Sequence, residues 1–389
     1  MTTEGFEDSM TPPTDEFASR VARLRTALAQ RRLAAIIIDD CEALQYFTGY
    51  DISHSFYQAC IIPTEGEPFF VLRELDAPGL RASSWIKDII AIADWDSPVE
   101  EIARQIEAHG LARAPIGVDL CSRALTIQTY EALKVRLKAA QFVDVNNLTF
   151  QLRKTKSASE IVKVQAAADV ANETMKLLVD RVHAGMTESD AARLTAETFT
   201  RLGSDPGPLG NFTVGKGWDF VHVPSHNRTL SVGDVLHLEV CPRIEGYCAR
   251  MWRSLAIGAA SPEQHRSAEL LRSFQDRQFE AMKPGARARD VDKILREAVI
   301  GSGMRSTYSN ITGYTLGYNS NYTCRASDFT WAFHPRADWV IEEGMVFHMY
   351  TSAAGTVYSE TILIEGTGIK RLTTVERRLF SSDIYEKLE

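Results

Sequence analysis

The alternation of strand-like and helix-like segments over the first 150 residues limits the possible folds more than any other feature of this chain. Runs of β-branched and other apolar residues at 34–39 and 115–120 predict buried strands. Apolar residues at helical spacing predict helices at 17–31 and 126–140. Strands and helices that alternate in this way predict an α/β domain, which we place at residues 15–152.

A change of composition after this region marks a second domain, predicted over residues 157–386. Ser157 suits the N-cap of a helix, and Glu160 completes a capping box that predicts a long helix to about Val182. Pairs of helical segments then alternate with antiparallel hairpins. This order predicts an α+β domain in which two similar halves, related by a pseudo-twofold, cover one sheet.

Charge and composition exclude several classes of protein. The 389 residues carry a formal net charge of -8, so no basic surface for nucleic acid is expected. No segment reaches the ~18 apolar residues of a membrane helix, and the acidic N-terminus lacks the apolar core of a secretory signal. The six cysteines form no C-x-x-C pair. We therefore expect a cytoplasmic protein with reduced thiols and no structural zinc.

The stretch GDVLHLEVCPRIEGYCARMWRSLAIG, residues 233–258, predicts a hairpin that carries reactive groups. Strand alternation places Glu239 on a buried face, where an unpaired carboxylate is costly. Arg250 lies across the predicted hairpin and could pair with Glu239 in bidentate fashion. Two interpretations stay open, a structural Glu–Arg pair and a reactive carboxylate.

A second carboxylate, Glu360 in YSETILI, raises the same alternatives. If Glu239 and Glu360 converge on one site, their repulsion moves their pKa values apart. One could then act as general acid and the other as nucleophile or base. His222 is the candidate for proton transfer, because imidazole titrates near neutral pH.

Several other side chains are candidates for contact with a ligand. His348 would point into the site if Tyr350 does, since strand side chains repeat every two residues. Tyr314 and Tyr350 could orient a polar group through their hydroxyls, form an aromatic wall, or only fill space. His226 is either a site residue or part of a turn, and Trp252 is either a pocket residue or core.

Four motifs, in order along the chain, resemble those of the pita-bread superfamily of creatinases, aminopeptidases P and prolidases. They are HVPSHNRTLSVGDVLHLEV, GYTLG, EEGMVFHM and YSETILI. The resemblance covers nearly the whole chain. It implies an N-terminal creatinase-type α/β domain followed by a C-terminal pita-bread catalytic domain.

The metal ligands of that superfamily are not preserved. Its metallopeptidases hold two metal ions with carboxylates and a histidine, and the resemblance places Glu239, Arg250, Tyr314, Tyr350 and Glu360 at those positions. An arginine is always protonated and cannot donate an electron pair to a cation. We therefore predict that no metal and no other cofactor is bound.

A nearer likeness is to the metal-independent creatinase and ectoine hydrolase branch, through YFTGYDISHSFYQ, the LEV strand, MVFHM and TTVERRLF. It implies that Glu239 attacks a cyclic amidine carbon, that His222 moves the proton, and that Glu360 is a second carboxylate. The segment after GYTLGY, and the strand with Arg250 and Trp252, depart from that branch.

We therefore expect a metal-independent hydrolase of a small non-peptide C–N bond, in a cyclic amidine, an amide or a guanidino compound. The alternatives are a cyclase or lyase on the same scaffold, a catalytically inactive protein that binds a ligand or partner, and a metallopeptidase. The resemblance also implies a homodimer, in which Tyr50 and Phe56 of one subunit reach the active site of the other.

Overall fold

The structure is a computed structural model, and it describes residues 14–50, 53, 55–215, 227–319 and 330–382. The chain forms two compact units that divide after Arg153. No helix in the described part of the chain combines the length and apolar character that crossing a membrane requires.

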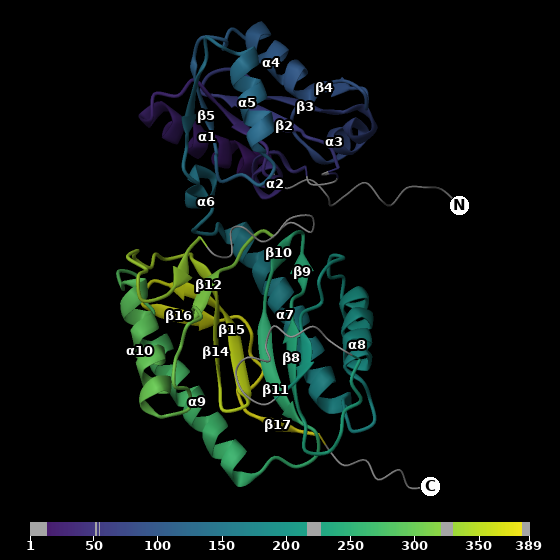
Figure 1. Cartoon of the computed structure of the whole chain (residues 1–389), viewed down its shortest axis with the longest axis vertical. Helices are drawn as coiled ribbons and strands as arrows, with labels where there is room; N and C mark the ends of the chain where they lie inside the picture. Colours follow the sequence, from purple (N-terminus) through teal and green to yellow (C-terminus); the bar gives the residue numbers. More distant parts are fainter. Residues whose placement is uncertain (1–13, 51–52, 54, 216–226, 320–329, 383–389) are drawn as a thin grey trace, which may run out of the picture. The chain divides into compact units, whose positions relative to one another are not determined.

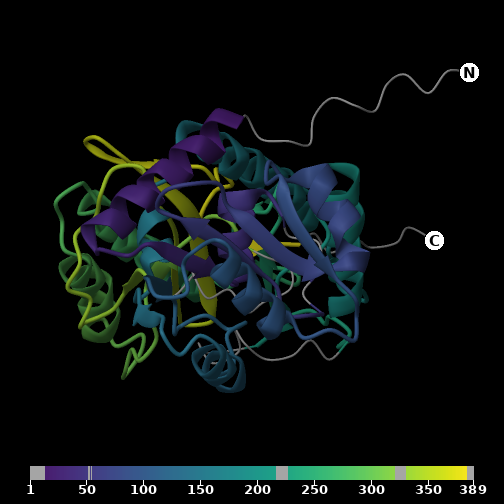
Figure 2. The same ribbon diagram turned by 90° about the horizontal axis from the view of Figure 1, so that it is seen from above.

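A six-stranded mixed sheet forms the centre of the N-terminal unit, in the order β4-β3-β2-β1-β5-β6. Helices α1 to α3 pack on one face of this sheet and α4 and α5 on the other (Figures 1 and 2). The elements are α1 (Thr14–Gln30), β1 (Ala35–Ile38), α2 (Cys41–Thr48), β2 (Ala59–Pro63), β3 (Phe69–Arg73), the 3-10 turn η1 (Glu74–Asp76), α3 (Ala77–Ser83), β4 (Asp88–Ile92), α4 (Pro98–Ala108), β5 (Pro115–Val118), α5 (Ile127–Arg136), β6 (Gln141–Asp144) and α6 (Leu148–Leu152).

The sequence of β1 is apolar throughout because helices cover both faces of the sheet. Ile36 and Ile38 pack among the helices on one side, and Ile37 packs on the other. Asp40, the second residue after the strand, accepts hydrogen bonds from two backbone amides at the start of α2. Gly49 ends that helix in the left-handed conformation with a φ of 82°.

A nine-stranded sheet forms the centre of the C-terminal unit. Seven strands follow the order β13-β12-β14-β15-β11-β8-β7, while β16 pairs with β15 and β17 with β11. The elements are α7 (Ala158–Arg181), α8 (Glu188–Arg201), β7 (Phe212–Val214), β8 (Val235–Val240), β9 (Arg243–Ile244), β10 (Tyr247–Cys248), β11 (Met251–Ala256), α9 (Pro262–Glu280), α10 (Ala288–Gly301), β12 (Gly313–Thr315), β13 (Ala332–Phe333), β14 (Val346–Ala353), β15 (Thr356–Glu365), β16 (Gly368–Arg371) and β17 (Phe380–Ser381).

Two helix pairs pack on the same face of this sheet. Met251 of β11 belongs to the apolar cluster with α7 and α8, and Met349 of β14 belongs to the cluster with α9 and α10. Trp252 and Tyr350 both pair with Ser359, so these three side chains lie on one face of the sheet. Met251 and Met349 each precede one of them in the chain, so both methionines lie on the opposite face. We call the face opposite these methionines the inner face.

The predicted fold class is confirmed: an α/β unit precedes an α+β unit with two helix pairs on one sheet. The predicted capping box is also confirmed. Glu160 N donates to Ser157 Oγ at 3.2 Å, and Ser157 N donates to the carboxylate of Glu160 at 2.8 Å. The helix that follows ends at Arg181, with Val182 as its C-cap.

Candidate active site

A row of four side chains crosses the inner face of the C-terminal sheet. Glu239 on β8 pairs with Trp252 on β11, Trp252 pairs with Ser359 on β15, and Ser359 pairs with Tyr350 on β14. Directly paired residues of neighbouring strands project to the same side. We call these four residues the inner row.

Glu239 is held from two directions by Asn211. The side-chain amide of Asn211 donates to Glu239 Oε2 at 2.8 Å, and Glu239 N donates to the carbonyl of Asn211 at 2.8 Å. Gly210 makes this approach possible, since a Cβ at that position would lie 2.2 Å from the carbonyl oxygen of Glu239. Glu239 is 4 % exposed, so its carboxyl group lies in a nearly completely buried position.

A thiol lies next to this carboxylate. Burial raises the pKa of Cys241 well above its usual value, and the charge of Glu239 raises it further. Cys241 is therefore protonated at neutral pH and is not the nucleophile of this face.

Arg250 lies two residues before Trp252 and therefore also on the inner face. Its guanidinium donates to the hydroxyl of Tyr314 and lies 5.4 Å from the centre of that ring. The register places Trp252, and not Arg250, opposite Glu239. Of the two interpretations, the bidentate pair is not observed, because no ion pair joins Arg250 to Glu239 within the described residues.

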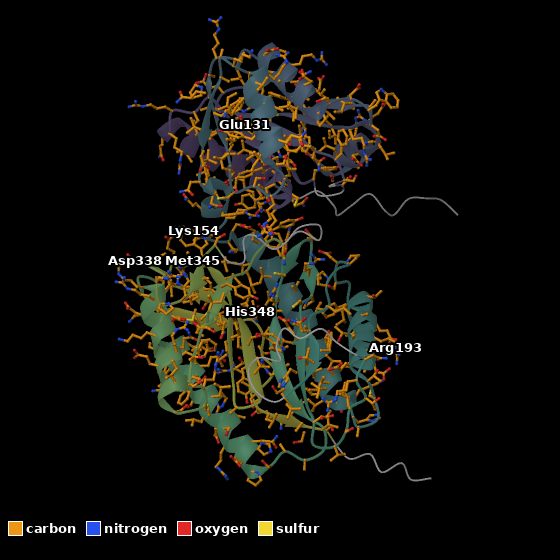
Figure 3. All side chains as sticks on the ribbon, in the orientation of Figure 1. Glu131, Lys154, Arg193, Asp338, Met345 and His348 are labelled. Carbon is orange, nitrogen blue, oxygen red and sulfur yellow. The ribbon has the colours of Figure 1, made fainter. Side chains whose placement is uncertain are left out.

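Three aromatic rings lie together beside Arg250. The ring of His348, which Figure 3 labels, is 5.0 Å from that of Tyr314 and 5.5 Å from that of Tyr350. Burial, together with the nearby charge of Arg250, lowers the pKa of His348 well below its usual value. The imidazole is therefore neutral. Burial raises the pKa of Tyr350 to about 12, so its phenol stays protonated.

Several buried polar atoms on the inner face lack a hydrogen-bond partner among the described residues. They are the indole nitrogen of Trp252, the hydroxyl of Ser359 and both ring nitrogens of His348. These side chains are at most 3 % exposed. Other buried polar atoms without a partner in the described part of the chain lie elsewhere, such as the hydroxyls of Thr351 and Tyr358 on the helix-covered face. Buried polar groups are nearly always satisfied, so the four atoms of the inner face are open to hydrogen bonds with a ligand or with water.

Glu360 does not converge with Glu239, contrary to our expectation. It follows Ser359 directly and pairs with Met349, so its side chain projects toward the helix-covered face. There its carboxylate accepts from Arg253 at 2.7 Å and from the hydroxyl of Thr373. Glu360 and Arg253 are both fully buried, which makes this a structural ion pair.

Sequence reasoning therefore missed Asn211 and Ser359. Asn211 lies 28 residues from its partner in the chain, and no local pattern marks it. Ser359 could have been found from Tyr350, because two residues that pair across neighbouring strands share a face. That deduction requires the register between the strands, which a single sequence does not supply.

The remaining predicted residues lie elsewhere or outside the description. His222 and His226 fall outside the described residues. Tyr50 is fully buried in the core of the N-terminal unit, edge-on to Phe70 at 5.6 Å, so the prediction that it reaches a partner subunit is wrong. Phe56 is half-buried and lines a separate hollow of the same unit.

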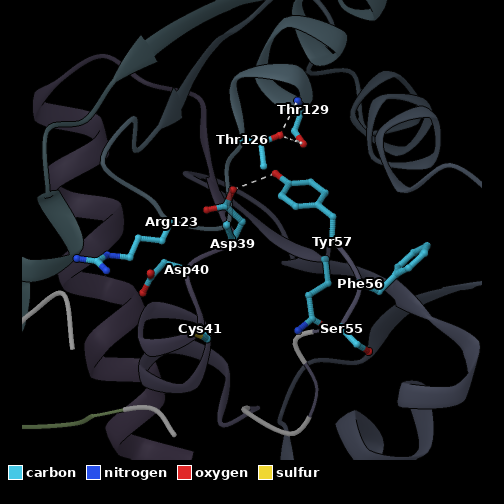
Figure 4. A pocket seen from close by; sticks show the side chains of 11 residues that line it. Asp39, Asp40, Cys41, Ser55, Phe56, Tyr57, Arg123, Thr126 and Thr129 are labelled. Carbon is cyan, nitrogen blue, oxygen red and sulfur yellow. Dashed lines mark hydrogen bonds between the residues drawn. The ribbon is translucent and has the colours of Figure 1, made fainter. Parts of the chain in front are cut away.

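That hollow has a volume of about 350 Å³ and lies near the carboxyl end of β1 (Figure 4). Tyr57 donates its hydroxyl hydrogen to Asp39 Oδ2 at 3.0 Å. Burial is the main cause that raises the pKa of Asp39 to about 7, although hydrogen bonds from Ser122 and Tyr57 oppose it. The acid is thus already satisfied within its own unit.

The side chains of the inner face do not fit a dinuclear metal centre. Glu239 supplies one carboxylate and His348 one neutral imidazole, whereas Arg250 adds a permanent cation, and Tyr314, Tyr350 and Ser359 add only hydroxyls. The described residues contain no group of three or more His, Cys, Asp or Glu side chains placed to hold a metal ion. Divalent ions require several carboxylate or imidazole ligands, so this donor set is unsuitable.

Comparison with known proteins matches both units of the chain to family models. Residues 162–372 match the model of metallopeptidase family M24, and residues 20–155 match the creatinase/prolidase N-terminal domain. An ectoine hydrolase of Halomonas elongata is 25 % identical over 94 % of this chain and 97 % of its own length. A Xaa-Pro dipeptidase of Lactobacillus helveticus is 24 % identical over 86 % of this chain and 91 % of its own length.

Solved structures share the fold at lower identity. The X-Pro aminopeptidase of Thermotoga maritima superposes with a TM-score of 0.80 at 19 % identity, covering 93 % of this chain and 99 % of its own. The dipeptidase PepE of Mycobacterium ulcerans also gives a TM-score of 0.80, at 21 % identity, covering 96 % of this chain and 100 % of its own.

Proposed function

This chain belongs to metallopeptidase family M24, and we propose that it is a hydrolase that cleaves a C–N bond of a small molecule without a metal ion. The superfamily resemblance predicted from the sequence is thereby confirmed. Relatives named as an ectoine hydrolase and a Xaa-Pro dipeptidase both support C–N hydrolysis. The donor set of the inner face favours hydrolysis without a metal ion over the chemistry of a metallopeptidase.

The observation that carries the proposal is the buried carboxylate of Glu239 beside partnerless polar groups. Glu239 is fixed by Asn211, and its row neighbours Trp252 and Ser359 lack partners among the described residues. A fixed carboxylate in a site that excludes water is a stronger nucleophile or base than one in solution. Glu239 is thus the group on this face best placed to attack an electrophilic carbon.

The proposed chemistry needs one carboxylate and one proton carrier. Glu239 attacks the carbon of an amidine or amide and forms a C–O bond. The C–N bond then breaks as the nitrogen takes a proton, and water releases the acyl group from Glu239. His222 keeps its predicted role as the proton carrier, although it lies outside the described residues. Glu360 has no role, because Arg253 holds it on the other face.

Turnover by chelator-treated enzyme tests the proposal. We would incubate the protein with ectoine, with creatine as a guanidino acid, and with the dipeptide Ala-Pro, and follow the release of amine. We expect turnover of a non-peptide substrate that chelator does not reduce. Glu239→Gln should abolish it, while Glu269→Gln on an exposed side chain serves as the matched control.

The other outcomes separate the alternatives. Cleavage of Ala-Pro alone, and only with added divalent metal, would identify a metallopeptidase. Ring closure of an open-chain substrate, without hydrolysis, would identify a cyclase. Failure to convert any substrate with or without metal would contradict the proposal and favour a protein that only binds ligands.

A further inference from the structure

Three uncharged side chains on the inner face can together hold one anionic group. Trp252 and Ser359 are direct partners across β11 and β15, and His348 lies on the next strand, β14. We infer that Trp252, Ser359 and His348 bind a carboxylate of the substrate, so that the substrate class is a small carboxylic acid that also carries the scissile C–N bond. This inference rests on the proposed function for the identity of the site.

The donor chemistry of these groups suits an acceptor on a ligand. The indole N–H of Trp252 is a donor only, so it cannot be satisfied by another donor. The hydroxyl of Ser359 and one nitrogen of the neutral His348 each supply a further hydrogen. None of these groups finds a partner among the described residues. A carboxylate offers two oxygens and about four lone-pair positions, which matches this surplus of donors.

Two charged side chains lie near the three donors: Arg250, which favours an anion, and Glu239, which faces Trp252 and opposes one. Arg250 lies on the same face, two residues before Trp252, and its backbone N and O both bond the hydroxyl of Thr361 at 2.8 and 2.9 Å. Thr361 in turn lies opposite His348 on β14. The backbone of Arg250 is therefore fixed near His348, and burial together with the charge of Arg250 lowers the pKa of His348 and keeps it neutral.

The spacing of the row limits the size of the substrate. Neighbouring strands lie about 5 Å apart, so Ser359 and Glu239 are separated by about 10 Å. The carboxylate at one end and the carbon attacked by Glu239 at the other must fit within this span. A single-ring or short-chain acid satisfies that limit. A longer peptide would have to extend beyond the row.

The indole resonance of Trp252 provides a direct test of binding without turnover. We would record the indole N–H signals of 15N-labelled Glu239→Gln protein while adding ectoine, butyrate or the isosteric butyramide. We expect the two carboxylates to shift the Trp252 signal in a saturable manner and butyramide to leave it unchanged. Ser359→Ala should weaken the binding of ectoine about 5- to 10-fold, the loss expected for one hydrogen bond.

The Trp252 signal is assigned, and the experiment controlled, with variants of single tryptophan residues. Trp252→Phe identifies the signal by its loss, and Trp95→Phe is the matched control because Trp95 is 88 % exposed. If Trp252→Phe fails to fold, Ser359→Ala assigns the signal by perturbing its direct neighbour. A Trp252 signal that ignores both carboxylates, or that responds equally to butyramide, would overturn the inference.

The two proposals can fail separately. Binding is measured in Glu239→Gln, which is expected to be inactive, so absence of the Trp252 response refutes the carboxylate site alone. Intact binding of ectoine together with no turnover by the wild-type protein would refute the hydrolase and leave the carboxylate site standing.

Discussion

Asn211 and Glu239 are joined by two hydrogen bonds of 2.8 Å, one through the side chain and one through the backbone. The backbone bond fixes the strand on which Glu239 lies, and the amide bond fixes the carboxylate itself. A single asparagine thus determines both the place and the orientation of the proposed reactive group.

Replacement of Asn211 should reduce turnover without unfolding the protein. In Asn211→Ala the carboxylate of Glu239 loses its charge-assisted hydrogen bond while the backbone bond remains. We expect kcat to fall at least tenfold, with a melting temperature within a few degrees of the wild type. Steady-state kinetics and thermal unfolding measure the two effects, with the exposed Gln128→Ala as control. Unchanged kcat would remove Asn211 from the positioning of Glu239.

Replacement of Glu360 should affect stability more than catalysis. Glu360→Gln leaves the fully buried Arg253 without its countercharge, which typically costs about 3–5 kcal/mol in the free energy of unfolding. Glu365→Gln, at the exposed end of the same strand, should cost almost nothing. Urea unfolding compares the two variants. Lost activity at full stability would return Glu360 to the catalytic site.

Stability should depend on pH through Asp39. Its pKa is about 7 in the folded protein and near the ordinary 3.8 in the unfolded chain. Between these values the unfolded chain releases a proton that the folded protein keeps. The contribution of Asp39 to the free energy of unfolding is thus greatest below pH 4 and is lost as the pH rises to about 7. The total change in this free energy is several kcal/mol at most.

The variant Asp39→Asn should remove this pH dependence. We expect the stability of the wild type relative to Asp39→Asn to fall steadily from pH 4 to pH 7 and to stay constant above pH 8. Urea midpoints across this range provide the measurement. A constant difference between the two proteins over the whole range would show that Asp39 titrates normally.

Metal analysis should find no stoichiometric divalent ion after purification. The reason is the donor set of the inner face, where Arg250 occupies a position that a ligand would need. Elemental analysis, together with activity before and after dialysis against chelator, measures this. One or two equivalents of metal whose removal abolishes activity would contradict the prediction.

The fold could be predicted from the sequence because its signals are local. The capping box at Ser157, the β-branched run of β1 and the left-handed Gly49 each determine an element within a few residues. Strand alternation also placed Glu239 on a buried face. These features depend on near neighbours in the chain and need no knowledge of tertiary structure.

The site could be predicted only in part because it depends on pairing between distant strands. Whether Ser359 or Glu360 lies on the inner face depends on which of them pairs with Tyr350, a residue nine or ten positions away in the chain. Whether Arg250 or Trp252 lies opposite Glu239 likewise depends on the register of β8 with β11. Tyr50 was mistaken for an interface residue because its sequence motif says nothing of how deeply the ring is buried.

The buried pair of Glu360 and Arg253 also stabilises the register of β15. A slip of β15 by one residue would exchange the faces of every side chain on that strand. It would present Glu360 to the inner face, about 10 Å from Glu239, and hide Ser359 among the helices. Arg253 opposes that slip, because it would lose its partner in the core. The pair thus holds the register that keeps Ser359, and not Glu360, on the inner face.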